Sequence, residues 1–130
     1  MKHNKEEVIE HELKRANASL RAANLLTQEK LWNDIANRLY YACFYAVSAY
    51  LTYLDIETTT HKGLKMMFHK HIIKEKLIPQ DWKDFFNEVW SKRQEGDYSK
   101  MALFDGTDIE PLIEKTKEFI ATIKNSISNQ

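Results

Sequence analysis

Glycine and proline are scarce in this sequence. The 130 residues include three glycines and two prolines, about 4% of the chain against the roughly 12% that is usual in soluble domains. Sandwiches and barrels need many turns built on these two residues. The scarcity therefore argues against an all-β fold and favours helices joined by short links.

Cysteine and long apolar runs are also missing. Cys43 is the one cysteine, which excludes a disulfide framework and a zinc site built from several thiolates. No apolar run approaches the roughly 20 residues that cross a bilayer, and the first seven residues lack the apolar core of a signal peptide. We therefore expect a cytoplasmic protein in which Cys43 is an inert core thiol.

The chain carries no excess of charge, since Lys and Arg total 19 and Asp and Glu total 19. This balance excludes a uniformly basic protein that coats nucleic acid. The charge is nevertheless uneven, because residues 61–76 hold five lysines and one glutamate, a local charge of +4, together with three histidines. That segment is either a phosphate-facing surface or a solvated face whose counter-charge lies elsewhere in the fold.

Metal binding is not expected from the histidines of this segment. His69 and His71 are two residues apart, so on a helix they point in widely different directions, unlike the paired histidines of a helical zinc site. The sequence predicts neither a metal nor a cofactor.

Apolar residues recur with a helical period along most of the chain. The pattern predicts five helices, at roughly 5–27, 30–54, 61–76, 81–95 and from about 108 onward. Thr60 is the expected N-cap of the third helix, and Gly96 is expected to interrupt or end the fourth. Pro111 is expected in the first turn of the fifth helix, where its missing donor matters little. We expect one all-α domain over residues 1–130, an up-and-down antiparallel bundle.

The second predicted helix has no charged residue from Leu39 to Leu54. A helix that is apolar all round must be covered on most sides. It is therefore the centre of the bundle, or it also lies in a dimer interface.

Two arginines are candidates for a functional site. Arg93 and Asp97 are four residues apart and would form an ion pair on one helix face, or a functional cluster with Tyr98 at the end of an element. Arg38 is likewise four residues from Asp34, which favours a structural pair over a phosphate contact.

Residues 36–47, ANRLYYACFYAV, resemble the second-helix signature of prokaryotic HEPN domains (higher eukaryotes and prokaryotes nucleotide-binding). Residues 60–64, 93–98 and the closing helix at 109–127 follow in the matching order. The resemblance spans about residues 8–125. It implies a small all-α bundle, commonly a homodimer, often encoded beside a minimal nucleotidyltransferase in toxin–antitoxin-like pairs.

Many HEPN domains are metal-independent endoribonucleases with an arginine, four to six further residues and a histidine, and two copies form one composite RNA site. Arg93 matches that arginine, but Tyr98 stands where the histidine would be. A phenol with a pKa near 10 is a poor general base at neutral pH. In some paired HEPN toxins a nearby tyrosine accepts a nucleotidyl group from the partner, a role that Tyr98 would have by resemblance. The resemblance and the lysine-rich third helix together give two sets of candidate site residues: Arg93, Asp97 and Tyr98 as catalytic, and Asn37, Arg38, His61, Lys62 and Lys65 as nucleotide- or RNA-binding.

Three functional hypotheses follow from these features. The leading one is an RNA- or nucleotide-binding module that works with a nucleotidyltransferase. The second is a metal-independent endoribonuclease with a degenerate Arg-x4-Tyr motif. The third is a structural dimerisation or adaptor bundle, which predicts that Arg93, Asp97 and Tyr98 pair internally, away from any cleft or dimer seam.

Overall fold

The computed structural model describes residues 3–98 and 103–129. Over these residues it contains five α-helices: α1 (Lys5–Leu26), α2 (Trp32–Tyr53), α3 (His61–Phe68), α4 (Trp82–Tyr98) and α5 (Gly106–Ser128). A short 3-10 turn (Thr27–Glu29) follows α1, and a π-helical turn (His69–Ile73) follows α3. The described residues form no β-strand. The prediction of an all-α, five-helix fold is confirmed.

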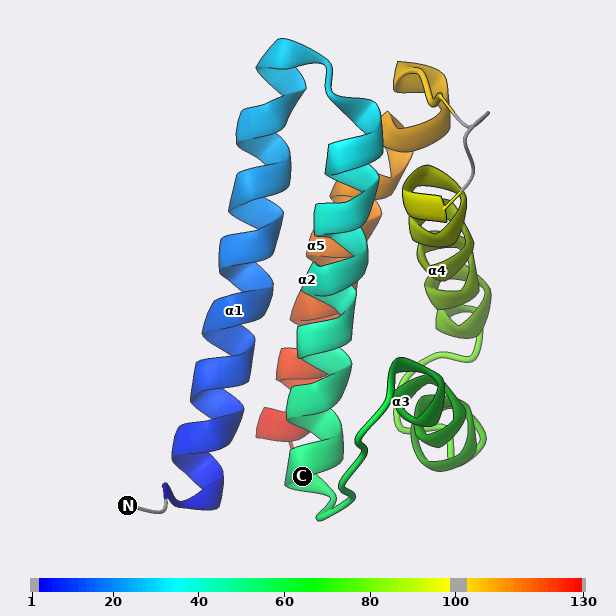
Figure 1. The fold of residues 1–130 in the computed structure, drawn as a ribbon. Coiled ribbons are helices and arrows are strands. Elements are labelled where there is room, and N and C mark those ends of the chain that lie inside the picture. The colour runs from blue at the N-terminus through cyan, green and yellow to red at the C-terminus, as the bar shows by residue number, and fades with distance from the viewer. Residues whose placement is uncertain (1–2, 99–102, 130) are drawn as a thin grey trace.

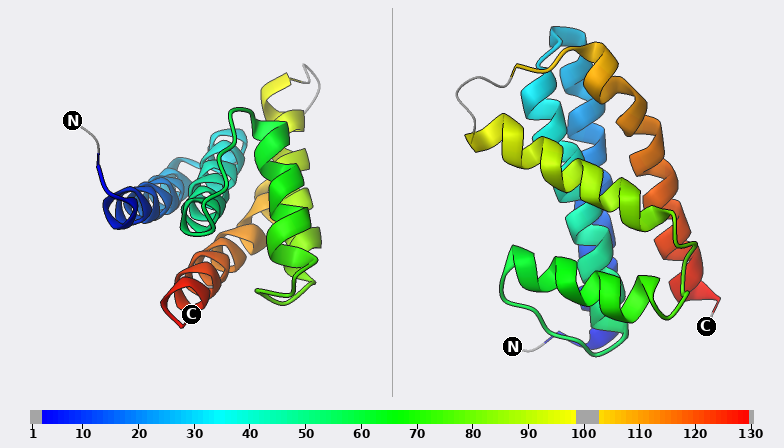
Figure 2. Two further views of the ribbon diagram at one scale, coloured as in Figure 1. Left: turned by 90° about the horizontal axis from the view of Figure 1, so that it is seen from below. Right: turned by 90° about the vertical axis from the view of Figure 1, so that its right-hand side faces the viewer.

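Helix α2 is the centre of the structure and packs against each of the other four helices. Helix α1 runs antiparallel beside it, and α5 lies along the same pair (Figure 1). Helices α3 and α4 cover the side of α2 that faces away from α1 (Figure 2). The uncharged run in the sequence therefore corresponds to a helix that is covered on several sides, as a helix that is apolar all round requires.

An aromatic cluster joins α3, α4 and α5 beside α2. The ring centroids of Phe68 and Phe86 lie 4.8 Å apart, and those of Phe68 and Phe119 lie 5.9 Å apart. All three side chains are fully buried. Burial of each such side chain stabilises the fold by about 1.5–3 kcal/mol, so this cluster anchors α3 and α4, two of the three helices that carry candidate site residues.

Three helices begin with side-chain caps: α1 at Asn4, α3 at Thr60 and α5 at Asp105. The Thr60 hydroxyl accepts a hydrogen bond from the Gly63 amide at 2.9 Å, which confirms the predicted cap of α3. At α5 the Asp105 carboxylate accepts from the Asp108 amide, and the Asp108 carboxylate accepts from the Asp105 amide. This capping box starts α5 two residues before the expected position. Pro111 consequently lies inside the helix and not in its first turn.

The expected end of α4 at Gly96 is wrong, because the helix continues to Tyr98. A Cβ at position 96 would lie 3.2 Å from Cε2 of Phe104 and 3.8 Å from the Asn33 side chain. Gly96 is thus needed for a close approach between chain segments and not for a turn. None of the described helices is long and apolar enough to cross a membrane.

Candidate functional site

An ion pair on the last turns of α4 is the starting point of the site. Nε of Arg93 donates to Oδ2 of Asp97 at 3.0 Å, and the side chains are 13% and 29% exposed. Their spacing of four residues places both on one face of the helix. Nδ2 of Asn37 on α2 donates to the same Asp97 oxygen at 3.0 Å. A three-residue network therefore ties α4 to α2.

The Arg93 guanidinium lies against two aromatic rings of α2. Its Cζ is 5.1 Å from the ring centroid of Tyr40 and 5.5 Å from that of Tyr41, and Nη2 donates to the Tyr41 hydroxyl at 3.4 Å. A cation over an aromatic face is stabilised by the quadrupole of the ring. The guanidinium is consequently held in one orientation by contacts from both helices.

His61, the first residue of α3, joins this cluster from a third helix. Its Nδ1 lies 2.7 Å from the hydroxyl of the buried Tyr40, and its ring centroid lies 4.6 Å from that of Phe44. Burial lowers the pKa of His61 below the ordinary value of 6.5, and the positive charge of Arg93 lowers it further. The imidazole is therefore neutral near pH 7.

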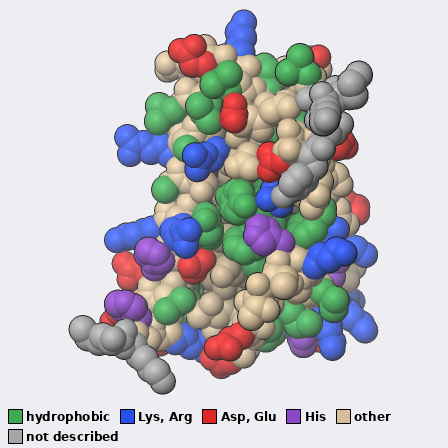
Figure 3. Space-filling view, viewed as in Figure 1, with side chains coloured by type: hydrophobic (Ala, Val, Ile, Leu, Met, Phe, Trp, Pro, Cys, Tyr) green, Lys and Arg blue, Asp and Glu red, His purple; other side chains and the backbone are tan. Residues whose placement is uncertain are grey.

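Lys65 extends the positive charge one turn further along α3. Its Nζ lies 4.6 Å from the ring centroid of Trp90, whose ring centroid lies 5.7 Å from that of Tyr40. Lys65 is therefore connected to the Arg93 cluster through two aromatic rings. Figure 3 shows hydrophobic, basic and histidine side chains adjoining on the face where α2 meets α3 and α4.

Two of the other candidate residues, Arg38 and Lys62, lie outside this cluster. Arg38 is exposed on α2, and the structure places no ion pair between it and Asp34. Lys62 is exposed in the first turn of α3 and takes no part in the network. Tyr98 ends the backbone of α4, but its side chain lies outside the described residues. The described residues contain no group of three or more His, Cys, Asp or Glu placed to hold a metal ion.

The aromatic members of the cluster were not among the predicted site residues. Tyr40 and Tyr41 follow Asn37 by three and four residues, and Trp90 precedes Arg93 by three. These spacings place each aromatic residue on the same helix face as a candidate polar residue. Helical periodicity applied to the candidates themselves would have found them.

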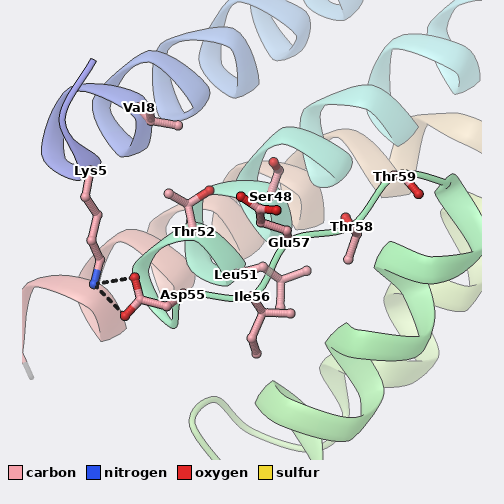
Figure 4. A pocket seen from close by; sticks show the side chains of 10 residues that line it. All are labelled: Lys5, Val8, Ser48, Leu51, Thr52, Asp55, Ile56, Glu57, Thr58 and Thr59. Atoms are coloured by element: carbon pink, nitrogen blue, oxygen red, sulfur yellow. Dashed lines mark hydrogen bonds and ion pairs between the residues drawn. The ribbon is translucent and has the colours of Figure 1, made fainter. Parts of the chain in front are cut away.

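A separate hollow lies near the C-terminal end of α2, away from the Arg93 cluster. Residues of α1, α2 and the α2–α3 loop line it, and Lys5 pairs with Asp55 at its edge at 3.3 Å (Figure 4). None of the candidate site residues contributes to its lining. Its polar groups are therefore independent of the candidate site.

The geometry brings a permanent cation, an amide and a neutral imidazole to one face. The guanidinium remains charged at every physiological pH, and its planar fork suits a phosphate. Neighbouring half-buried rings, those of Tyr41, Phe44 and Tyr45, are suited to stacking against nucleobases. The arrangement fits a phosphate-bearing ligand that also carries aromatic groups.

Comparison with known proteins identifies similar chains. The family model described as HEPN domain matches residues 9–126. A "UPF0332 protein" of Thermotoga maritima is 30% identical over 125 residues, which cover 96% of this chain and 95% of that protein. "Putative toxin MJ0142" of Methanocaldococcus jannaschii is 28% identical over 116 residues, covering 89% of this chain and 79% of the relative. "Putative toxin MJ0605" of the same organism is 26% identical and covers 86% and 83%.

Proposed function

Since this chain belongs to the HEPN domain family, we propose that it binds RNA or a nucleotide through the Arg93 cluster, as one member of a toxin–antitoxin-like pair. The observation that carries the proposal is the fixed Arg93 guanidinium, which Asp97 and two tyrosine rings orient beside His61. A prepositioned cation loses little side-chain entropy when it binds a phosphate. Aromatic rings next to it favour single-stranded RNA, whose bases are free to stack.

The partner is proposed from the family and not from the geometry. Small HEPN proteins of this kind are often encoded in a pair with a minimal nucleotidyltransferase. Two relatives of this chain carry the word toxin in their names. We propose such a partner and a homodimer of this chain. Co-expression with a nucleotidyltransferase encoded next to it, followed by co-purification and determination of the mass in solution, tests both. A monomer that does not bind that protein contradicts this part.

The binding proposal is tested with a labelled single-stranded RNA of about 12 nucleotides, a length within the usual site sizes for single strands. The wild type should bind it, and added salt should weaken binding. Arg93→Ala should weaken binding by at least about tenfold, because a hydrogen bond to a charged group contributes about 1.5–3 kcal/mol. Arg21→Ala on α1, an exposed arginine on another helix, is the matched control and should bind like the wild type.

The contrary result is equally defined. If the wild type shows no salt-sensitive binding, or if Arg93→Ala binds as the wild type does, the Arg93–Asp97 pair is an internal ion pair of a structural bundle. The adaptor hypothesis predicts that outcome.

One observation favours a second candidate function, metal-independent cleavage of RNA. The family motif lacks its histidine here, but the structure brings His61 to Arg93 from another helix. In this reaction the 2′-oxygen attacks phosphorus and its proton moves to the imidazole. The P–O5′ bond then breaks and the imidazole returns the proton to the 5′-oxygen. The products are a 2′,3′-cyclic phosphate and a 5′-hydroxyl, and Arg93 stabilises the negative charge that develops on the phosphoryl oxygens.

The hydrogen bond to Tyr40 decides how His61 can act. When Nδ1–H donates to the Tyr40 hydroxyl, Nε2 keeps its lone pair and accepts the proton of the 2′-hydroxyl. When the Tyr40 hydroxyl instead donates to Nδ1, the ring proton is on Nε2, which then cannot accept the proton of the 2′-hydroxyl. The pKa of His61, lowered by burial and by Arg93, favours the neutral ring that a general base needs.

Incubation with RNA in the presence of EDTA tests the cleavage hypothesis. Cleavage should disappear in His61→Asn and in Arg93→Ala but persist in Tyr98→Phe. Loss of cleavage in Tyr98→Phe, with retention in His61→Asn, would assign the proton transfer to Tyr98. Absence of cleavage by the wild type would contradict the hypothesis and leave the binding proposal intact.

A further inference from the structure

A basic hollow lies where the π-helical turn packs against the start of α4. Three lysines line it, Lys70, Lys74 and Lys83, together with His69 and the apolar side chains of Met66 and Ile73. No acidic side chain is among the described residues that line it. Lys70 belongs to the π-helical turn, Lys74 directly follows it and Lys83 belongs to α4, so the approach of Lys83 to the other two lysines results from the tertiary structure.

These lysines have no carboxylate partner among the described residues. The ion pairs between described residues are His3–Glu7, Lys5–Asp55 and Arg93–Asp97, and none of them includes a lysine of the hollow. Among the described residues, the local charge of +4 on residues 61–76 is therefore not neutralised by close contacts with acidic side chains. Burial lowers the pKa of the nearby His69, and the charges of Lys83 and Lys65 lower it further. The hollow is accordingly a region of positive potential.

A chain of neighbouring side chains links the hollow to the Arg93 cluster. Lys65 lies close enough to His69 to lower its pKa, and it also lies over the Trp90 ring. Trp90 contacts Tyr40, and Tyr40 contacts the Arg93 guanidinium. Tyr40 itself is fully buried beneath this path, whereas the rings of Tyr41 next to Arg93 and of Trp90 next to Lys65 are half-buried. Cations beside accessible rings are characteristic of surfaces that follow a single nucleic-acid strand, where cations contact phosphates and rings stack on bases.

We propose that the hollow formed by Lys70, Lys74 and Lys83 holds backbone phosphates of the same single RNA strand that binds at Arg93. The proposal rests on the function proposed above and extends it from one phosphate to several nucleotides. It follows that a mononucleotide occupies the Arg93 cluster alone, whereas an oligonucleotide also contacts the lysines. The lysines contribute affinity and salt dependence, and Arg93 fixes the position of the strand.

The experiment compares two ligands and two matched triple variants. One variant combines Lys70→Ala, Lys74→Ala and Lys83→Ala. The control combines Lys14→Ala, Arg21→Ala and Lys124→Ala, which remove the same number of exposed cations from α1 and α5. The ligands are a labelled single-stranded RNA of about 12 nucleotides and adenosine 5′-monophosphate. Thermal unfolding checks that both variants fold as the wild type does.

The variant of the hollow should lose at least about tenfold in RNA affinity and keep its affinity for the mononucleotide. Its slope of log affinity against log salt should be shallower by about 2, because each phosphate contact on a single strand contributes about 0.7. The control variant should change each affinity by less than about threefold, since its cations lie away from the strand.

Each contrary outcome has a separate meaning. If the variant of the hollow binds RNA as tightly as the control variant does, the inference is wrong. If Arg93→Ala then still loses binding of both RNA and the mononucleotide, the proposed function remains supported. If the lysines matter for RNA but Arg93→Ala changes nothing and the mononucleotide does not bind, the proposed function fails and the hollow alone binds RNA. If poly-glutamate of matched charge displaces the RNA equally well, the hollow binds acidic chains in general, and its assignment to RNA is wrong.

Discussion

Arg93 and Asp97 form an ion pair one turn apart on α4, with 3.0 Å between Nε and Oδ2, and Asn37 of α2 donates to the same carboxylate oxygen. Asp97 therefore has two opposing effects on a phosphate ligand. Its negative charge repels the ligand, while its hydrogen bond holds the guanidinium in place. Because these effects have opposite signs, a single substitution can separate them.

Asp97→Asn should weaken RNA binding, by about 3- to 10-fold, although it removes a negative charge. The loss of a charge-assisted hydrogen bond leaves Arg93 less well oriented, and the ordering of such a side chain costs about 0.5–1.5 kcal/mol on binding. The affinity for the labelled RNA measures the effect. Asp84→Asn, at an exposed acid of the same helix, is the control and should leave binding unchanged or slightly stronger. Stronger binding by Asp97→Asn would show that Asp97 acts through its charge alone.

The free energy of unfolding should decrease as the pH is lowered below about 6.5. Burial, with the charge of Arg93, lowers the pKa of His61 in the folded state, and burial with nearby lysines lowers that of His69. Both pKa values lie below the ordinary 6.5, so the unfolded chain binds protons more readily than the folded chain in that range. The stabilisation is complete above about pH 6.5 and is lost as the pH falls from there through the folded-state pKa values.

Urea unfolding at a series of pH values measures this dependence. His61→Asn and His69→Asn should each flatten the decline of the free energy of unfolding between about pH 7 and pH 5. His11→Asn on α1, an exposed position, should leave the slope of the wild type unchanged. An equal slope in all four proteins would contradict the effect of burial on the two histidines.

Gly96→Val should destabilise the fold by about 1–3 kcal/mol, the usual cost of added volume at a tightly packed contact. The new side chain would press on Phe104, which a Cβ alone would approach to 3.2 Å, and on Asn33. Chemical unfolding measures the loss. Ser91→Val places the same side chain at an exposed position of α4 and should cost only a few tenths of a kcal/mol. Equal effects of the two substitutions would show that the contact at Gly96 is not restrictive.

Cys43 should be unreactive toward a thiol reagent in the folded protein. Its side chain is fully buried in α2, and this burial raises the pKa of the thiol, so the reactive thiolate is not populated at neutral pH. Labelling with an aromatic disulfide reagent measures it: no reaction in buffer, and complete reaction after unfolding in guanidinium. Rapid labelling in buffer would show that α2 opens locally in the folded state.

Much of the fold was predictable because its information is local. Periodicity placed α1 and α2 within a few residues of their observed bounds, and the Thr60 cap was read correctly from the sequence. The errors have local causes as well. Gly96 continues a helix because Phe104 and Asn33 pack closely against it, a contact that periodicity does not reveal. The apolar period of α5 begins only at Ile109, so it does not reveal that the capping box of Asp105 and Asp108 starts the helix at Gly106.

The sequence by itself determined that Arg93 and Asp97 share a helix face, because their separation of four residues is one helical turn. It also determined that α2 is apolar enough to be central. Only the tertiary structure decided that Asn37 and His61 meet at this pair while Arg38, adjacent to Asn37, does not. The rotation and crossing of three helices set that outcome. These depend on how distant aromatic side chains pack together, and no local pattern encodes that packing.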